Sequence, residues 1–340
     1  MAVPPTTRLL TPEEIAVQAG QQVPYVRLPE GATLFAEREM RLRQRAVGHA
    51  MRDFLLFVAD LSHAQHVLLQ SAVPVPVPTA DAIDAAARAG LPPLPADRWV
   101  RDGAWREGLR AMLDTLMRGL DGSPALPGVR AVQRAARDDT WLDQQADRLL
   151  HGVMPGLDLA AAPLLAAALQ VYWTRLVLDT QAARGDDRLP PFGRTDQPTR
   201  CPGCGSRPTA SISRLGADAG FRYLHCALCS VEWHMVRIKC SHCQSTKGIH
   251  YQSLQRVGGD PSEAPAAVEA ETCDECGHYL KIVHMERDPN VEPVADDLAS
   301  VTLDLLVSEA GYQRHGVNLM LLFGDPDTAP DAAPDDGGGG

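Results

Sequence analysis

The chain has 340 residues, a formal net charge of −11 and eight cysteines. At roughly 100–200 residues per domain this length predicts two or three domains, and a hydrophobic share of 45% excludes a wholly disordered chain. The acidic balance argues against a protein that binds nucleic acid mainly through charge, because phosphate binding needs a surplus of lysine and arginine. Part of this charge lies in residues 325–340, which contain five aspartates.

We predict no targeting or membrane segment. Residues 1–20 lack the apolar stretch of a secretory signal. The longest apolar run, at 159–169, has eleven residues and is interrupted by Pro163, whereas a membrane span needs about 20. We therefore expect a cytoplasmic protein that does not span a membrane.

The first half of the chain, residues 1–185, contains no cysteine and has the pattern of successive helices. Apolar residues recur at spacings of three and four, which is typical of helices with one buried face. The segments with this pattern are 34–70, 105–120, 140–150 and 163–183. Thr79 is a start signal for a further, alanine-rich helix that ends at Gly90. This half is therefore expected to be an all-helical domain.

Two proline runs, at 73–78 and 91–95, separate these helices. Because proline fixes the backbone and cannot continue a helix, we expect rigid connectors. A polyproline ligand for a partner protein is the alternative.

A glycine-, proline- and aspartate-rich linker is predicted at 186–199. Alternating patterns beyond it predict strands at 230–239, 248–254 and 279–284, with a loop at 257–269. A C-terminal helical segment is expected over 291–324, with its helix at 295–311 capped by Asp296 or Asp297, followed by a disordered tail at 325–340.

All eight cysteines lie in four Cys-x-x-Cys pairs, a pattern in which each turn directs two thiolates at one ion and two turns complete a tetrahedron. The first two pairs are separated by 21 residues and the last two by 29, and both gaps suit a four-sulfur site. Gly205 and Gly277 follow two of the pairs and let the backbone turn toward the sulfurs. We expect one metal ion at Cys201, Cys204, Cys226 and Cys229 and a second at Cys240, Cys243, Cys273 and Cys276.

Other uses of the cysteines are less favoured. A disulfide framework does not suit a reducing compartment, and a thioredoxin-like redox motif needs only one such pair. An interleaved arrangement of the four pairs is geometrically feasible, but sequential pairing lets each site close its own small module. Zinc and iron both suit four thiolates, and neither leaves an open position for hydrolytic chemistry.

Histidines lie beside the cysteines, and they are His225, His234, His242 and His278. They are candidate replacement ligands or hydrogen-bond donors to the ligands, but packed or solvent-facing strand residues are the favoured interpretation, since each site already has four cysteines. Asp60, His63 and His66 share a helix face as a loose metal pattern, which we interpret as an ordinary polar face. No catalytic constellation is found, so we do not expect an enzyme.

Four segments are distinctive, and they read RCPGCGSRP at 200–208, GFRYLHCALCSVEWHMVRIKC at 220–240, AETCDECGHYLK at 270–281 and EPVADDLA at 292–299. Together they resemble the FdhE family of formate dehydrogenase accessory proteins. All eight cysteines fall where that family has its metal ligands. The resemblance implies a helical domain followed by two rubredoxin-like modules that bind iron, with zinc as the alternative metal. It also implies a non-catalytic role in the cytoplasmic maturation of the catalytic subunit of respiratory formate dehydrogenase.

The expected fold class is therefore α+β. A helical domain at 1–185 precedes two small rubredoxin-like, zinc-ribbon-like modules at 200–238 and 239–290, and a C-terminal helix follows. The oligomeric state and the surface that meets a partner stay open.

Two other functions are considered. A rubredoxin-like electron carrier is one. The other is a nucleic-acid-binding zinc ribbon, in which Trp233 or Tyr251 stack on bases and the basic contacts are Arg237, Lys239 and Lys247. Residues 200–295 contain ten lysines and arginines against eleven aspartates and glutamates, so no basic domain supports nucleic-acid binding.

Overall fold

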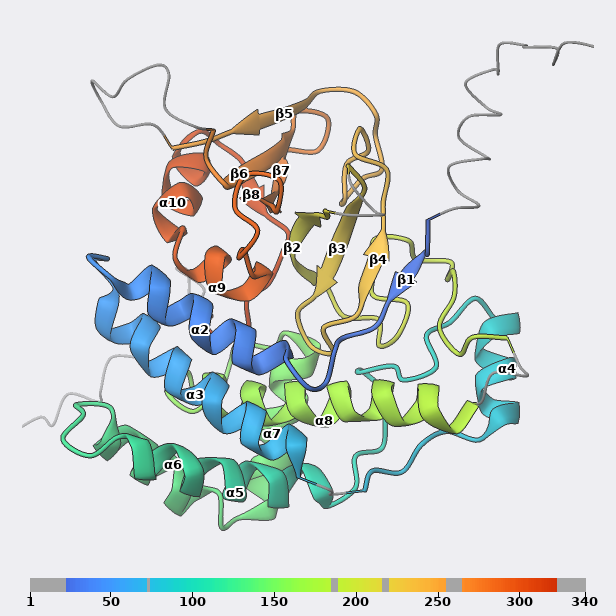
Figure 1. Ribbon diagram of the computed structural model, residues 1–340. Coiled ribbons are helices and arrows are strands. Elements are labelled where there is room, and N and C mark those ends of the chain that lie inside the picture. Colours follow the sequence, from blue (N-terminus) through green and yellow to red (C-terminus); the bar gives the residue numbers. More distant parts are fainter. Residues whose placement is uncertain (1–22, 72–73, 185–188, 216–219, 255–264, 323–340) are drawn as a thin grey trace, which may run out of the picture.

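The computed structural model describes residues 23–71, 74–184, 189–215, 220–254 and 265–322. Within them the fold is α+β, as expected. The helices of the first half form one layer and a single sheet forms a second, with two shorter helices beside the sheet (Figure 1). The expectations for residues 1–20 and 325–340 concern segments outside the described residues.

Helices are found at every place where the sequence predicts one in the first half. They are α2 (Leu34–Ala46), α3 (Arg52–Gln70), α4 (Ala80–Arg88), α5 (Ala104–Gly119), α6 (Leu126–Ala135), α7 (Asp139–His151) and α8 (Ala162–Arg184). Sequence analysis does not predict α6. Among the described residues, no helix is both long enough and apolar enough to cross a bilayer.

The segment 34–70 is a helical hairpin rather than one continuous helix. The break falls at Gly48, whose φ of +68° is left-handed and incompatible with a right-handed helix. Val47, which fits the apolar periodicity, is 83% exposed because it lies at this break. Periodicity misses the turn because the apolar spacing continues across it.

Thr79 caps α4 as expected, since its hydroxyl accepts a hydrogen bond from the amide of Ala82. The proline run at 91–95 is a connector in which Leu94 is buried and Leu91 is exposed. The amide of Leu94 donates to the carbonyl of Gly203, and that of Ala96 donates to the carbonyl of Cys204. This connector thereby joins the helical half to the first cysteine turn.

The strands form one sheet in the order β1-β4-β3-β2-β7-β6-β5, with β8 beside β7. They are β1 (Val26–Arg27), β2 (Pro208–Ser213), β3 (Arg222–Cys226), β4 (Glu232–His234), β5 (Ile249–Gln252), β6 (Val268–Cys273), β7 (His278–His284) and β8 (Gln313–Arg314). The two cysteine modules are fused, because β2 of the first runs parallel to β7 of the second, pairing Ser211 with Ile282. A strand from the first half, β1, also joins the sheet, by pairing with β4.

Two local expectations are wrong. Of the strand predicted at 230–239, only Glu232–His234 is a strand, namely β4. The chain leaves the sheet after β4, and Ile238 is 66% exposed. The helix predicted at 295–311 is two helices, α9 (Pro293–Leu298) and α10 (Val301–Glu309). The cap of α9 is Glu292, whose carboxylate accepts from the amide of Ala295. Neither Asp296 nor Asp297 is the cap.

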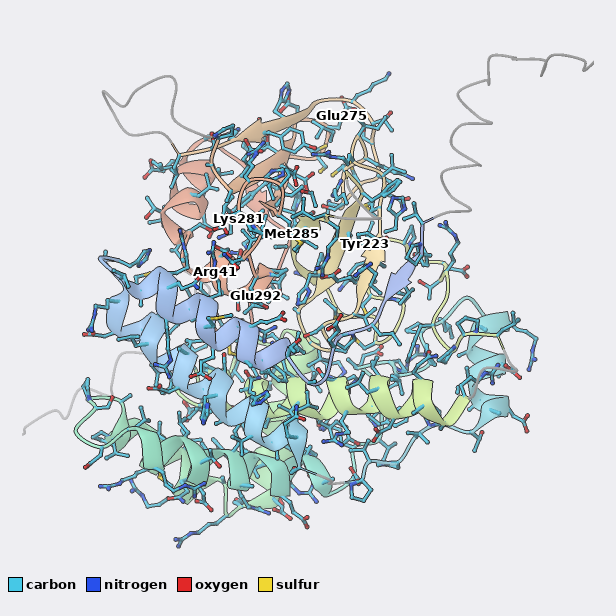
Figure 2. The ribbon with its side chains drawn as sticks, in the orientation of Figure 1. Arg41, Tyr223, Glu275, Lys281, Met285 and Glu292 are labelled. Carbon is cyan, nitrogen blue, oxygen red and sulfur yellow. The ribbon has the colours of Figure 1, made fainter. Side chains whose placement is uncertain are left out.

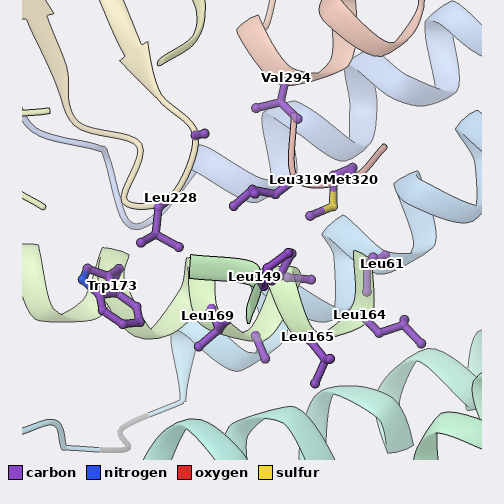
Figure 3. Packing of buried hydrophobic residues seen from close by; sticks show 14 of the residues in the cluster. Leu61, Leu149, Leu164, Leu165, Leu169, Trp173, Leu228, Val294, Leu319 and Met320 are labelled. Carbon is purple, nitrogen blue, oxygen red and sulfur yellow. The ribbon is translucent and has the colours of Figure 1, made fainter. Parts of the chain in front are cut away.

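The main core extends from the helices into the first module. Almost every residue of α8 between Leu164 and Val177 is buried, because α8 has the other helices on one side and the sheet on the other. Leu228, from the second cysteine turn, points onto α8 beside Leu169 and Trp173 (Figure 3). The first cysteine module thus completes the core of the helical half.

Candidate metal centres

Four thiols meet at the end of the sheet nearest α8, and we call this group site 1. It consists of Cys201, Cys204, Cys226 and Cys229. Every one of them is buried, and all four sulfur atoms lie within 4.8 Å of one another. The Sγ atoms of Cys201 and Cys229 are 3.5 Å apart, as are those of Cys204 and Cys226. Backbone amides point at these sulfurs, including that of Leu228 at 3.4 Å from the Sγ of Cys226.

A second group, site 2, lies in the second module, where β6 turns into β7. It consists of Cys240, Cys243, Cys273 and Cys276. The Sγ–Sγ distance is 3.8 Å both from Cys240 to Cys276 and from Cys243 to Cys273. Site 2 is more open than site 1, because Cys243 is exposed and Cys276 is half-buried. The cysteines therefore gather sequentially and not in the interleaved arrangement.

Both groups fit a metal ion. A tetrahedron of sulfurs about 2.3 Å from a zinc ion has edges of roughly 3.8 Å, close to the distances in site 2 and slightly longer than those in site 1. A disulfide needs sulfurs about 2.05 Å apart, and all eight cysteines are free thiols. The two sites thus suit two metal ions with four sulfur ligands each.

The four cysteine turns share one backbone feature. The residue that follows the second cysteine has a positive φ in each: 76° at Gly205, 57° at Ser230, 65° at Gln244 and 67° at Gly277. Ser230 and Gln244 are the non-glycine residues with positive φ in the described part of the chain. Such backbone is costly for a residue with a Cβ. Its recurrence at these positions indicates that the sulfur geometry determines the turn.

Electrostatics in site 1 oppose four simultaneous thiolates. Burial raises the pKa of Cys201 and Cys229 well above the usual thiol value. Burial also acts on Cys204, but hydrogen bonds from the neighbouring thiols outweigh it and lower the pKa of that residue. The metal-free group therefore resists full ionisation, and four thiolates at this site need a cation.

The neighbouring histidines divide into two pairs. His225 is buried with its Nδ1 at 3.4 Å from a Glu232 oxygen, and His234 packs edge-on against Tyr223. Both are packed strand residues. The rings of His242 and His278 stack 4.0 Å apart, and their nitrogens lie within 4.8 Å of the Cys276 sulfur. This second pair flanks the open edge of site 2.

Ordinary contacts account for several other sequence candidates, whereas the buried Nδ1 of His66 has no hydrogen-bond partner among the described residues. Asp60 pairs with Arg43 at 2.7 Å, and His63 with Glu39 at 3.0 Å, so these residues join α3 to α2. Trp233 is buried, with its indole nitrogen donating to the carbonyl of Pro198, and it cannot stack on a base. The predicted linker also packs in part, since Phe192 belongs to the main core.

A buried charge network at α9 is not predicted from the sequence. Arg41 of α2 donates two hydrogen bonds to Asp296, at 2.8 and 2.7 Å. Lys281 of β7 lies 3.0 Å from a carboxylate oxygen of Asp297 and 2.6 Å from one of Asp304. Figure 2 shows Arg41, Lys281 and Glu292 converging where the helices meet the second module. The network thereby fastens α9 to both halves of the molecule.

Comparisons with known proteins cover the same regions. Three family models match: "FdhE, N-terminal" at residues 23–186, "FdhE, central domain" at 200–237 and "FdhE, C-terminal domain" at 238–321. An FdhE homolog from Cronobacter sakazakii is 37% identical over 91% of this chain and 94% of its own length. Protein FdhE of Escherichia coli is 36% identical over the same shares.

A solved structure agrees with these matches. The crystal structure of the FdhE protein from Pseudomonas aeruginosa is 38% identical in sequence. It covers 89% of this chain and all of its own, with a TM-score of 0.76. The family models, the relatives and the solved structure therefore agree: the chain belongs to the FdhE family.

Proposed function

We propose that this protein is a non-catalytic maturation factor that binds the catalytic subunit of respiratory formate dehydrogenase in the cytoplasm. Family membership supports this role. The observation that carries the non-catalytic part is the pair of four-sulfur groups. A metal ion with four cysteine ligands has no open position for water or substrate, so each centre suits a structural or redox role better than hydrolysis.

We also propose that all eight cysteines are metal ligands, with iron as the metal and zinc as the alternative. A module of some 45 residues has little core of its own, so metal binding contributes to its folding free energy. The metal-loaded modules then act as a rigid scaffold for the partner subunit. Because thiolate–iron centres are oxidisable, binding of the partner depends on redox state.

Capture of the partner tests this proposal. The tagged full-length chain is used to capture the catalytic subunit of formate dehydrogenase, with and without oxygen. We expect capture by the wild type, and its loss in Cys201→Ser/Cys204→Ser and Cys240→Ser/Cys243→Ser variants whose helical content is intact. No association of the wild type under either condition contradicts the proposal.

An electron carrier is the second candidate function, and the exposed Cys243 of site 2 favours it. An exposed ligand gives an electron a short path to a partner. A reversible change in visible absorption with a measurable reduction potential supports this function. Zinc in both sites of protein purified without oxygen excludes it, because zinc has no redox chemistry.

A further inference from the structure

A cavity of about 630 Å³ adjoins site 1, between the C-terminal end of α7, the proline connector and the first cysteine turn. Cys201 and Cys204 form part of its lining, and Leu149, Leu228 and Leu319 give it an apolar portion. The volume lies within the range of about 300–1,000 Å³ that small-molecule sites occupy. Neither of the functions proposed above uses this cavity.

Two arginines without partners line the same cavity. Arg200 is half-buried and Arg207 is exposed, and neither guanidinium has a hydrogen bond or ion pair with any residue in the described part of the chain. Arg98 also lines the cavity but pairs with Asp97 at 3.5 Å, which leaves Asp196 as the remaining acid. Apart from the cysteines, the charged side chains of the lining therefore sum to a net positive charge, in a protein whose formal charge is −11.

The backbone holds these two cations near each other. Arg200 directly precedes Cys201, and the carbonyl of Arg207 accepts a hydrogen bond from the amide of Ala227 in the second cysteine turn. Two like charges held close together repel each other, so an anion between the two guanidinium groups is favoured, and guanidinium geometry suits carboxylate and phosphate oxygens.

We propose that this cavity binds a small organic anion, whose carboxylate or phosphate group lies between Arg200 and Arg207. Its apolar body packs against the leucines of the lining, because a bare ion leaves most of the volume unfilled. The ligand contacts the helical half and the first metal module together. Its binding therefore stabilises the seam between them.

Calorimetry of the metal-loaded full-length protein tests the proposal with octanoate and phenyl phosphate as probes. We expect saturable binding of at least one of them with one site per chain, and the preferred probe identifies the anionic group. Octanol, which has the chain of octanoate without its charge, should bind at least tenfold more weakly. No saturable binding of either anion, or binding of inorganic phosphate alone, overturns the proposal.

Variants locate the site. The Arg200→Gln/Arg207→Gln variant should bind the preferred probe at least tenfold more weakly than the wild type. The single variant Arg207→Gln changes an exposed side chain, and its affinity for the preferred probe should fall at least threefold. The charge-matched control is Arg134→Gln/Arg137→Gln, at exposed arginines on and beside α6, and it should bind as the wild type does. Unchanged probe affinity in the first two variants overturns the proposal. A reduced metal content in those variants would then show that the arginines only offset the charge of site 1.

Discussion

At the scale of single residues, the position after each second cysteine shows how the metal turns constrain the chain. Gly205 and Gly277 are predictable, because a glycine after Cys-x-x-Cys is a recognisable turn signal. Ser230 and Gln244 adopt the same left-handed backbone without that signal. The intrinsic preferences of serine and glutamine oppose this conformation, so we attribute it to the requirement that the sulfurs converge. A single sequence does not show that requirement at these two positions.

Replacing Gln244 by glycine should stabilise the metal-loaded protein by up to about 1 kcal/mol. Left-handed backbone costs roughly 1–2 kcal/mol for a residue with a Cβ, and glycine avoids this cost. Glycine also loses more conformational entropy on folding, which offsets about half of the stabilisation. Gln244 is exposed, so no packing is lost. The matched control is Gly277→Ala, which should destabilise by about 1 kcal/mol in urea unfolding. A Gln244→Gly variant that is less stable than the wild type contradicts this explanation.

Metal affinity should fall as the pH falls. Since the pKa values of Cys201 and Cys229 are raised in the metal-free protein, these thiols carry protons at neutral pH, and metal binding must release them. Lower pH increases proton competition for the sulfurs, and higher pH reduces it. Competition with a chromophoric chelator between pH 6 and 8 measures this dependence. An apparent affinity that does not change over this range would count against thiolate ligation.

At the scale of elements, α9 joins parts of the chain that are far apart in sequence. Its residue Asp296 binds Arg41, 255 positions away, and Asp297 binds Lys281 and Arg314. Sequence analysis interprets the adjacent aspartates as a helix start, because two acids near a helix N-terminus usually have that role. Their true partners lie on other elements, and pairing over such distances leaves no local pattern.

Removing one partner of this network should be strongly destabilising. We expect Lys281→Met to cost about 3–5 kcal/mol of unfolding free energy, because it leaves two buried carboxylates, those of Asp297 and Asp304, to share the single charge of Arg314. The control is Arg43→Met, which breaks a partly exposed pair with Asp60 and should cost no more than about 1 kcal/mol. Thermal and urea unfolding measure both. If Lys281→Met loses no more unfolding free energy than the control does, the network does not stabilise the fold as described.

At the scale of the whole molecule, the division into a helical half and a cysteine-rich half is predictable, because composition and periodicity change together near residue 186. The fusion of the two modules is not. It depends on the parallel pairing of β2 with β7, which lie some 70 residues apart in the sequence. The residue pattern of neither strand indicates which other strand it pairs with. The different exposure of the two sites follows from this assembly, since the helical half covers site 1 and leaves site 2 at the rim.

This asymmetry predicts two rates of metal loss. A chelator should remove the metal of site 2 at least tenfold faster than that of site 1, because Cys243 is exposed whereas every cysteine of site 1 is buried. The Cys243→Ser/Cys276→Ser variant should lack the fast phase, and Cys201→Ser/Cys204→Ser the slow one. Release in a single phase from the wild type is inconsistent with this description of the sites.

The central claim, that the cysteines form two independent four-sulfur metal centres, is tested most directly by counting metal ions per chain. Native mass spectrometry of protein purified without oxygen gives this number and identifies the metal. We predict two ions per chain in the wild type, and one in each variant that loses a cysteine pair from a single site. A wild-type chain with no metal or one ion, or with disulfides in place of thiolates, would contradict the account.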